Sequence, residues 1–270
     1  MVYRVIAIVT AVLLAAAVAA GLLARTVAGP AALGLGTWIA AFVAIDGLLL
    51  YAMLERRASL FGRIVWRGRA DQPRVALSFD DGPNEPYTSQ LLEVLREHGV
   101  RATFFMLGAN VDRHPDTVRR LIADGHEVGN HTYDHGVLPL RSPGAIRQAI
   151  RHGADAIERA AGVRPRLFRA PHGFRNPWVD RIARDEGCEP VAWTRGVFDT
   201  ARPGAEVIRA RVSDGLSNGC ILLLHDGRGT APHADAGQLV DALPGIITDA
   251  RARGFRFATV GELMADLRRS

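Results

Sequence analysis

The feature that most constrains the fold of this chain is an alternation, from Arg74 onward, of short apolar runs with longer amphipathic stretches. The apolar runs have the length of buried strands, and the stretches between them have the length of helices. Strands are predicted at Val75–Phe79, Ala102–Leu107, Glu127–Asn130, Leu167–Arg169, Pro190–Thr194, Cys220–His225 and Arg256–Ala258. Helices are predicted at Pro86–His98, Pro115–Asp124, Ser142–Ala161, Pro177–Glu186, Ala205–Leu216, Asp235–Arg253 and Val260–Arg268. This order predicts an α/β domain with a parallel sheet or barrel.

The N-terminal region is apolar and has the length of a membrane anchor. Val5–Ala24 carries no charge and is flanked by Arg4 and Arg25. A helix of this length, at about 1.5 Å per residue, spans the hydrocarbon core of a bilayer, which is roughly 30 Å thick. A second apolar run, about 31–54, is interrupted only by Asp46. We expect two transmembrane helices, with a cleaved signal peptide as the alternative for the first run.

These runs divide the chain into three parts. We expect a membrane anchor over residues 1–57, a basic linker over 58–73 and a catalytic domain over 74–270. The expected location is a membrane. The arginines that follow the second run favour the cytoplasmic side, whereas a single retained span would place the domain outside, so the sequence leaves the side open. These arginines are Arg56, Arg57, Arg63, Arg67 and Arg69.

Composition narrows the function further. The chain has 270 residues, of which 48% are hydrophobic, so its core is large enough to be stable without a disulfide. Cys188 and Cys220 are expected to be buried core residues. The net charge is +5, but the arginines are scattered rather than grouped with aromatic residues. We therefore expect no nucleic-acid partner, and no pattern indicates a protein partner.

Two adjacent carboxylates follow the first predicted strand, in the segment Ser78–Pro83 (Ser-Phe-Asp-Asp-Gly-Pro). The carboxyl ends of the strands are where α/β barrels keep their catalytic groups. Like charges push the pKa values of Asp80 and Asp81 apart, and a useful division is one metal ligand and one general base. The alternative is that both residues cap the next helix and shape the turn.

Two histidines four residues apart follow the third predicted strand. His131 and His135 can share one face of a helical turn and bind one metal ion. Together with Asp81 they form a plausible Asp-His-His site with open positions for water. Zinc suits such a set, and cobalt, nickel, manganese or iron would also be accepted by nitrogen and oxygen ligands.

Three further segments carry polar side chains at or after predicted strands. Arg169 and His172 lie in Arg-Ala-Pro-His-Gly, where a buried arginine can orient a carboxylate. Trp193 precedes Asp199 by six residues, and His225 ends the apolar run Leu-Leu-Leu-His. Taken singly, Trp193 and His225 are more readily interpreted as core residues than as site residues.

The joint pattern resembles the polysaccharide deacetylases of carbohydrate esterase family 4, which share the NodB homology domain. The resemblance covers roughly residues 74–268 and is carried by Ser-Phe-Asp-Asp-Gly-Pro, His-Thr-Tyr-Asp-His and Leu-Leu-Leu-His-Asp. It implies a distorted (β/α)7 barrel, here preceded by one or two transmembrane helices. It also implies a metal-dependent hydrolase that removes N-acetyl groups from amino sugars.

The resemblance implies a role for each candidate residue. Asp81, His131 and His135 would bind the divalent metal, usually zinc. Asp80 would be the general base, oriented by Arg169, and His225 the general acid, tethered by Asp199. The backbone N–H of His172 would stabilise the oxyanion, and Trp193 would contact substrate. The family often has Tyr at the position of His172, and its Asp-x-x-Asp-Trp pattern is absent around Asp199.

Several substrates remain open. Peptidoglycan, another N-acetylglucosamine polymer and a lipid-linked sugar at the membrane face are all acetylated amino sugars, and deformylation is a related amide chemistry. A catalytically inactive barrel that binds glycan is the alternative from another class.

Overall fold

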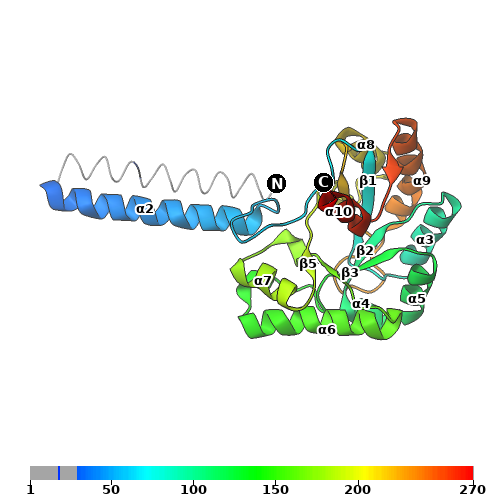
Figure 1. Cartoon of the computed structure of the whole chain (residues 1–270), viewed down its shortest axis with the longest axis horizontal. Helices are drawn as coiled ribbons and strands as arrows, with labels where there is room; N and C mark the ends of the chain where they lie inside the picture. The colour runs from blue at the N-terminus through cyan, green and yellow to red at the C-terminus, as the bar shows by residue number, and fades with distance from the viewer. Residues whose placement is uncertain (1–17, 19–28, 270) are drawn as a thin grey trace.

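The computed structural model describes residue 18 and residues 29–269. Its centre is a curled sheet in which all the paired strands run parallel, in the order β5-β4-β3-β2-β1-β7-β6, with β8 pairing with β1 (Figure 1). The strands are β1 (Arg74–Asp80), β2 (Thr103–Met106), β3 (Glu127–Asn130), β4 (Leu167–Phe168), β5 (Glu189–Pro190), β6 (Arg195–Gly196), β7 (Ile221–His225) and β8 (Arg256–Phe257). Each predicted strand has a counterpart, but β5 overlaps its predicted range, Pro190–Thr194, only at Pro190. Strand β6 is an addition that its two-residue length hides in the sequence.

Helices cover the outer face of this sheet. Neighbouring helices contact one another in the sequence α8, α9, α3, α5, α6, α7 around the outside. Their bounds are α3 (Tyr87–Glu97), α4 (Gly108–Arg113), α5 (Pro115–Ala123), α6 (Pro143–Ala161), α7 (Pro177–Asp185), α8 (Ala205–Gly215), α9 (Gly237–Ala252) and α10 (Val260–Arg268). The predicted helices are confirmed to within two residues, and α4 is again an addition.

The strands bury both faces, and their alternation sorts side chains between two cores. Val75, Leu77 and Phe79 of β1 pack outward with the helices, whereas Ala76 points into the concave side. By the same alternation Ser78 and Asp80 lie on the concave side, so the last residue of β1 turns its carboxylate inward. Cys188 and Cys220 are buried free thiols, as predicted.

A short segment of the predicted linker closes the gap in the sheet. Val65 bridges to Val191 beside β5, and Arg67 bridges to Cys220 at the start of β7. Val65 and Ile64 pack in the concave core with Leu263 of α10. We call residues 64–68 the seam, because they join the β5 side of the sheet to β7.

The predicted second transmembrane span coincides with α2 (Gly29–Leu54), which projects from the α/β domain in Figure 1. Within residue 18 and residues 29–269, no helix combines the length and the apolarity needed to cross a membrane. The predicted transmembrane region is therefore not supported. The predicted first span, 5–24, lies outside the described residues except for Val18.

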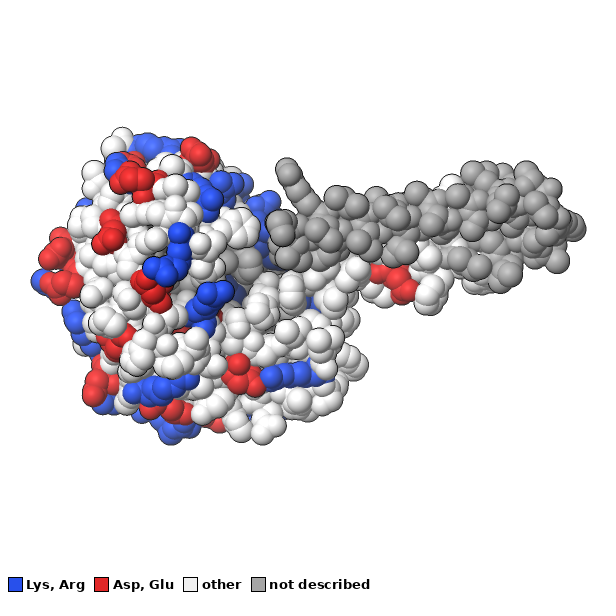
Figure 2. Space-filling model, turned by 180° about the vertical axis from the view of Figure 1, so that it is seen from behind, with Lys and Arg blue, Asp and Glu red and all other residues white. Residues whose placement is uncertain are grey.

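Charges on the domain surface are mixed rather than grouped by sign. On the face shown in Figure 2, basic and acidic side chains are interspersed over the α/β domain. Many pair directly, as Arg147 does with Glu186 and Arg209 with Asp249. This face therefore offers no broad basic surface for nucleic acid.

Candidate active site

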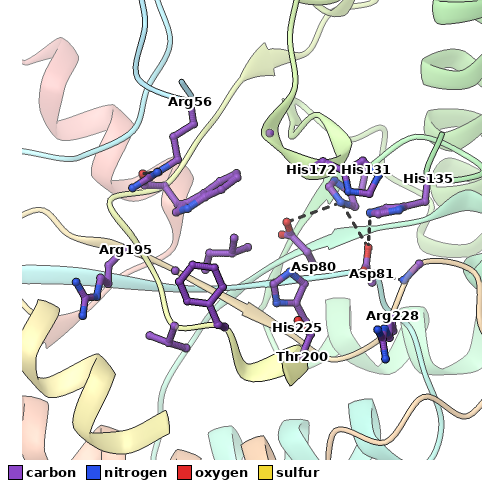
Figure 3. Close-up of a pocket in the computed structure, with 17 residues that line it drawn as sticks. Arg56, Asp80, Asp81, His131, His135, His172, Arg195, Thr200, His225 and Arg228 are labelled. Carbon is purple, nitrogen blue, oxygen red and sulfur yellow. Dashed lines mark hydrogen bonds and ion pairs between the residues drawn. The ribbon is translucent and has the colours of Figure 1, made fainter. Parts of the chain in front are cut away.

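Most of the predicted site residues meet in one cleft at the carboxyl ends of the strands. The cleft has a volume of about 650 Å³, and Figure 3 shows Asp80, Asp81, His131, His135, His172 and His225 around it. Trp193 also lines the cleft, while Arg169 and Asp199 lie behind its wall and contact lining residues. The parallel order of the sheet brings these side chains together because every strand ends at the same edge.

Asp80 is held by a buried arginine. Arg169 Nη1 donates to Asp80 Oδ1 at 2.6 Å and to Ser78 Oγ at 2.9 Å, and Nη2 donates to the Ala192 carbonyl at 3.2 Å. The guanidinium carbon lies 3.9 Å from the centre of the Phe105 ring. Burial lowers the pKa of Arg169, and the Asp80 carboxylate opposes this effect. Asp80 is thereby fixed with its other oxygen toward the cleft.

Asp81, His131 and His135 fit a metal ion. One ligand atom from each lies within 4.8 Å of the others, and Asp81 Oδ1 is 3.5 Å from His131 Nε2 and 3.1 Å from His135 Nε2. Asp81 Oδ1 is buried and accepts no hydrogen bond from the described part of the chain. A buried carboxylate oxygen facing two imidazole nitrogens is an arrangement that a divalent cation satisfies.

The protonation states of these ligands favour metal binding. Burial opposes ionisation of Asp81, but the contact with His135 and the positive charge of the nearby histidines outweigh it, so its pKa lies well below the usual range. Burial lowers the pKa of His131, which favours the neutral ring. Its Nδ1 lies 2.7 Å from the Arg169 carbonyl, so this nitrogen carries the proton and leaves Nε2 for the metal.

The two histidines do not share a helical turn, so that part of the prediction is wrong. Residues 131–137 form a loop, and Thr132 and His135 have left-handed backbone with φ of 73° and 60°. Asn130 Oδ1 accepts from the Thr132 backbone N–H at 2.8 Å, and Thr132 Oγ1 accepts from that of His135 at 3.2 Å. These bonds replace the helix and turn both imidazoles toward Asp81.

The alternative in which the two aspartates cap a helix is also excluded. α3 begins after Pro86, and its N-terminus has no side-chain cap. Asp81 instead has a φ of 76°, and its Oδ2 accepts from the Gly229 backbone N–H at 2.9 Å. The left-handed backbone turns Asp81 beside Asp80 rather than to the opposite face, so both carboxylates reach the cleft.

His225 and Asp199 form a second pair across the cleft. His225 Nδ1 lies 3.0 Å from Asp199 Oδ1, and the His225 backbone N–H donates to Asp199 Oδ2 at 2.7 Å. Burial opposes protonation of the ring, but the Asp199 carboxylate overcomes it and raises the pKa of His225 to about 9. Asp199 therefore contacts His225 as the resemblance implies, although its surrounding sequence diverges from the family pattern.

His172 and Trp193 form part of the wall. His172 has a φ of 59°, and its ring lies edge-on to that of His135 with centres 4.6 Å apart. Trp193 packs against Gly173 so closely that a Cβ there would lie 2.6 Å from the indole. Since Gly173 also has a φ of 73°, only glycine fits this place.

Sequence reasoning missed several residues of the cleft wall. They come from loops, from β6 and β7, and from the segment before the seam. They are Arg56, Gly173, Arg195, Gly196, Val197, Phe198, Thr200, Leu223, Arg228 and Gly229. A signal existed for the residues between Trp193 and Asp199, and for Gly173 and Leu223, which stand in the motifs of His172 and His225. None existed for Arg56, Arg228 or Gly229.

Comparisons with known proteins agree with this geometry. Residues 67–191 match the family model described as polysaccharide deacetylase. Over 214 residues the chain is 36% identical to a peptidoglycan-N-acetylglucosamine deacetylase of Bacillus cereus, which covers 78% of this chain and 98% of that protein. The chain belongs to the polysaccharide deacetylase family.

Two further relatives bear on this polysaccharide deacetylase. A chitooligosaccharide deacetylase of a Bradyrhizobium species is 36% identical and covers 70% of this chain and 90% of that protein. The crystal structure of a peptidoglycan N-acetylglucosamine deacetylase superposes with a TM-score of 0.70 at 31% identity, covering 74% of this chain and 92% of the other. The curled parallel sheet thus matches the distorted barrel that the resemblance implied.

Proposed function

We propose that this polysaccharide deacetylase hydrolyses N-acetyl groups of N-acetylglucosamine residues in a glycan, with peptidoglycan as the first candidate and a chitin-like oligosaccharide as the second. One observation carries the proposal. Asp80 on Arg169, the trio Asp81, His131 and His135, and His225 on Asp199 all meet in one cleft. The names of the relatives supply the substrate class.

Each residue has a chemical task in amide hydrolysis. A divalent cation held by Asp81, His131 and His135 would polarise the acetamido carbonyl and make water more acidic. Asp80 accepts the proton of the attacking water, because Arg169 binds its Oδ1 and leaves Oδ2 facing the cleft. His225, protonated at neutral pH, donates a proton to the departing sugar nitrogen. The products are acetate and a free amine, and the backbone N–H of His172 is the proposed oxyanion donor.

The metal is proposed to be zinc, because two imidazoles and one carboxylate form a ligand set that zinc commonly takes. Cobalt, nickel, manganese and iron remain candidates, since the same atoms suit them. An inactive glycan-binding barrel is disfavoured because Asp80, Asp81, His131, His135 and His225 are all present and line one cleft.

The shape of the cleft favours a polymer over a single sugar. A second hollow of about 260 Å³ shares Thr200, His225 and Arg228 with the main cleft. A glycan chain can therefore pass His225 and occupy space on both sides of the reacting sugar.

The proposal is tested by acetate release from N-acetylglucosamine oligomers by the full chain, before and after chelation. We expect chelation to abolish acetate release and added zinc or cobalt to restore it, because Asp81, His131 and His135 would together bind the one metal ion that the reaction needs. His131→Ala should bind metal poorly, and the exposed His152→Ala serves as a matched control outside the cleft. Acetate release that survives complete metal removal would refute the metal-dependent mechanism.

We further propose that the N-terminal region holds the domain at a membrane surface. The support is the exposed apolar surface of α2, on which Trp38, Phe42 and Ile45 are each more than half exposed. Such side chains lie favourably in the interfacial layer of a bilayer. Replacing all three with serine should reduce co-sedimentation of the full chain with phospholipid vesicles, and unchanged sedimentation would contradict this location.

A further inference from the structure

Arg56 reaches the cleft from outside the residues that match the family model. It lies between the end of α2 and residue 67, where that match begins. Its Nε donates to the Trp193 carbonyl at 3.2 Å and its Nη2 to the Thr194 carbonyl at 3.3 Å. The guanidinium carbon lies 5.4 Å from the centre of the Trp193 ring. These contacts hold Arg56 on the cleft wall (Figure 3).

The chain on either side of Arg56 is anchored to the domain. The backbone N–H of Arg175 donates to the Met53 carbonyl at 3.0 Å, and Arg175 Nη2 donates to the Ala58 carbonyl at 2.5 Å. Arg175 is itself buried and paired with Asp180 at 2.6 Å. A side chain placed between two such anchors has lost much of its conformational freedom before a ligand arrives, which favours binding.

The wall of the cleft is cationic outside the catalytic centre. Three arginines line the cleft, namely Arg56, Arg195 and Arg228, and its carboxylates are Asp80 and Asp81. Both carboxylates are already engaged, Asp80 by Arg169 and Asp81 by two histidines. Arg195 and Arg228 are exposed and form no ion pair with residues 29–269. A neutral glycan would offer no counter-charge to the guanidinium groups of Arg195 and Arg228.

Two of these arginines occupy the same end of the cleft. Figure 3 shows Arg56 and Arg195 at the end away from Asp81, His131 and His135. Arg56 donates to the carbonyls of Trp193 and Thr194, and Arg195 follows Thr194 in the chain. The aromatic residues Trp193 and Phe198 also line the cleft. Aromatic rings pack on sugar faces, and guanidinium groups bind carboxylates or phosphates through paired N–H donors.

We propose that Arg56, together with Arg195, binds an acidic group carried by the glycan next to the N-acetylated sugar that is hydrolysed. The inference rests on the proposed function and names its substrate class as an acidic amino-sugar glycan. The anionic oxygens can belong to a carboxylate on a neighbouring sugar or to a phosphate on a lipid-linked sugar. Both present the same chemistry to a guanidinium, and the experiment separates them.

The experiment compares kcat/KM of the full chain, loaded with zinc, on four substrates. These are neutral N-acetylglucosamine pentamer, glycan strands of alternating N-acetylglucosamine and N-acetylmuramic acid, the same strands with amidated carboxylates, and polyprenyl-diphosphate-linked N-acetylglucosamine in detergent. We expect an acidic substrate to exceed its neutral counterpart by about five- to tenfold, with the ratio falling as salt rises. The acidic substrate with the larger ratio identifies the source of the anion.

Single substitutions test whether the two arginines cause the preference for acidic substrates. Arg56→Gln and Arg195→Gln should each lower the acidic-to-neutral ratio toward one, and Arg56→Lys should retain part of it because it keeps the charge. Arg57→Gln is the matched control, since Arg57 donates to the same Thr194 carbonyl at 2.7 Å but does not line the cleft. Its ratio should equal that of the wild type.

Two results would overturn the inference. One is a wild-type ratio of one for both acidic substrates, and the other is a ratio in Arg56→Gln and Arg195→Gln that matches Arg57→Gln. Either result, with acetate still released from the pentamer, leaves the deacetylase function intact. Failure to release acetate from all four substrates would instead refute the proposed function.

Discussion

Two buried arginine–aspartate pairs in this molecule are nearly identical in geometry and differ in use. Arg169–Asp80 and Arg175–Asp180 both have N–O distances of 2.6 Å, and all four side chains are at most 4% exposed. Asp80 ends a central strand and keeps Oδ2 3.8 Å from His131 Nε2, at the cleft. Asp180 lies inside α7, and its partner Arg175 holds the chain at Met53 and Ala58.

The comparison shows that burial and pairing do not by themselves mark a catalytic carboxylate. A buried ion pair costs desolvation in either place, so its presence is weak evidence for either stability or function. Position decides the role, because a carboxylate at the carboxyl end of a strand faces the cleft, whereas one within a helix faces its neighbours. Burial raises the pKa of Asp180 despite Arg175, which is the behaviour of a structural pair.

The largest expected effect comes from breaking the first pair. Asp80→Asn should lower kcat for acetate release by about a hundred- to ten-thousandfold, because an amide cannot accept the proton of the attacking water. Zinc content, measured on the purified variant, should match the wild type, since Asp80 is not one of the three ligands. A kcat within threefold of the wild type would show that Asp80 is not the base.

The pair His225–Asp199 extends the comparison to a cationic side chain that, unlike arginine, can lose its proton within the working pH range. With its pKa raised to about 9, His225 is protonated below that pH, so activity should fall as the pH rises through about 9. Asp199→Asn removes the charge that raises this pKa and leaves the opposing effect of burial. The alkaline limb of the kcat profile should therefore move to lower pH, and kcat should fall by about tenfold or more. A limb that stays in place would separate Asp199 from the acid.

The smallest effect on chemistry is expected from the second pair. Asp180→Asn leaves the Arg175 charge buried without its counter-ion, so the free energy of unfolding should fall by about 3 kcal/mol in urea titrations. Acetate release from the neutral pentamer should change by less than about threefold, since Asp180 lies in α7 and outside the cleft. A loss of kcat as large as that of Asp80→Asn would erase the distinction between the two pairs.

The sequence predicted the site residues that strands position, but few of those that loops position. Asp80, Arg169 and His225 stand at strand ends, so the alternation of strands and helices is enough to bring them together. His131 and His135 come close to each other because Thr132 and His135 have left-handed backbone. The four-residue spacing of the two histidines suggested a helical turn instead, and no sequence pattern revealed this loop conformation. Arg56 lies far from every motif and reaches Trp193 through contacts spanning 137 residues, which no local pattern records.

The seam determines where this chain can be shortened. A fragment that begins at Asp71, just before the first predicted strand, would lack both bridges that join Val191 and Cys220 to residues 65 and 67. The unpaired backbone beside β5 would then be available to strands of other molecules, as exposed sheet edges are. The shortest fragment that keeps the sheet closed starts before Ile64, and light scattering of the two fragments would show the difference. A boundary drawn from the catalytic motifs alone would therefore cut away the segment that covers this edge of the sheet.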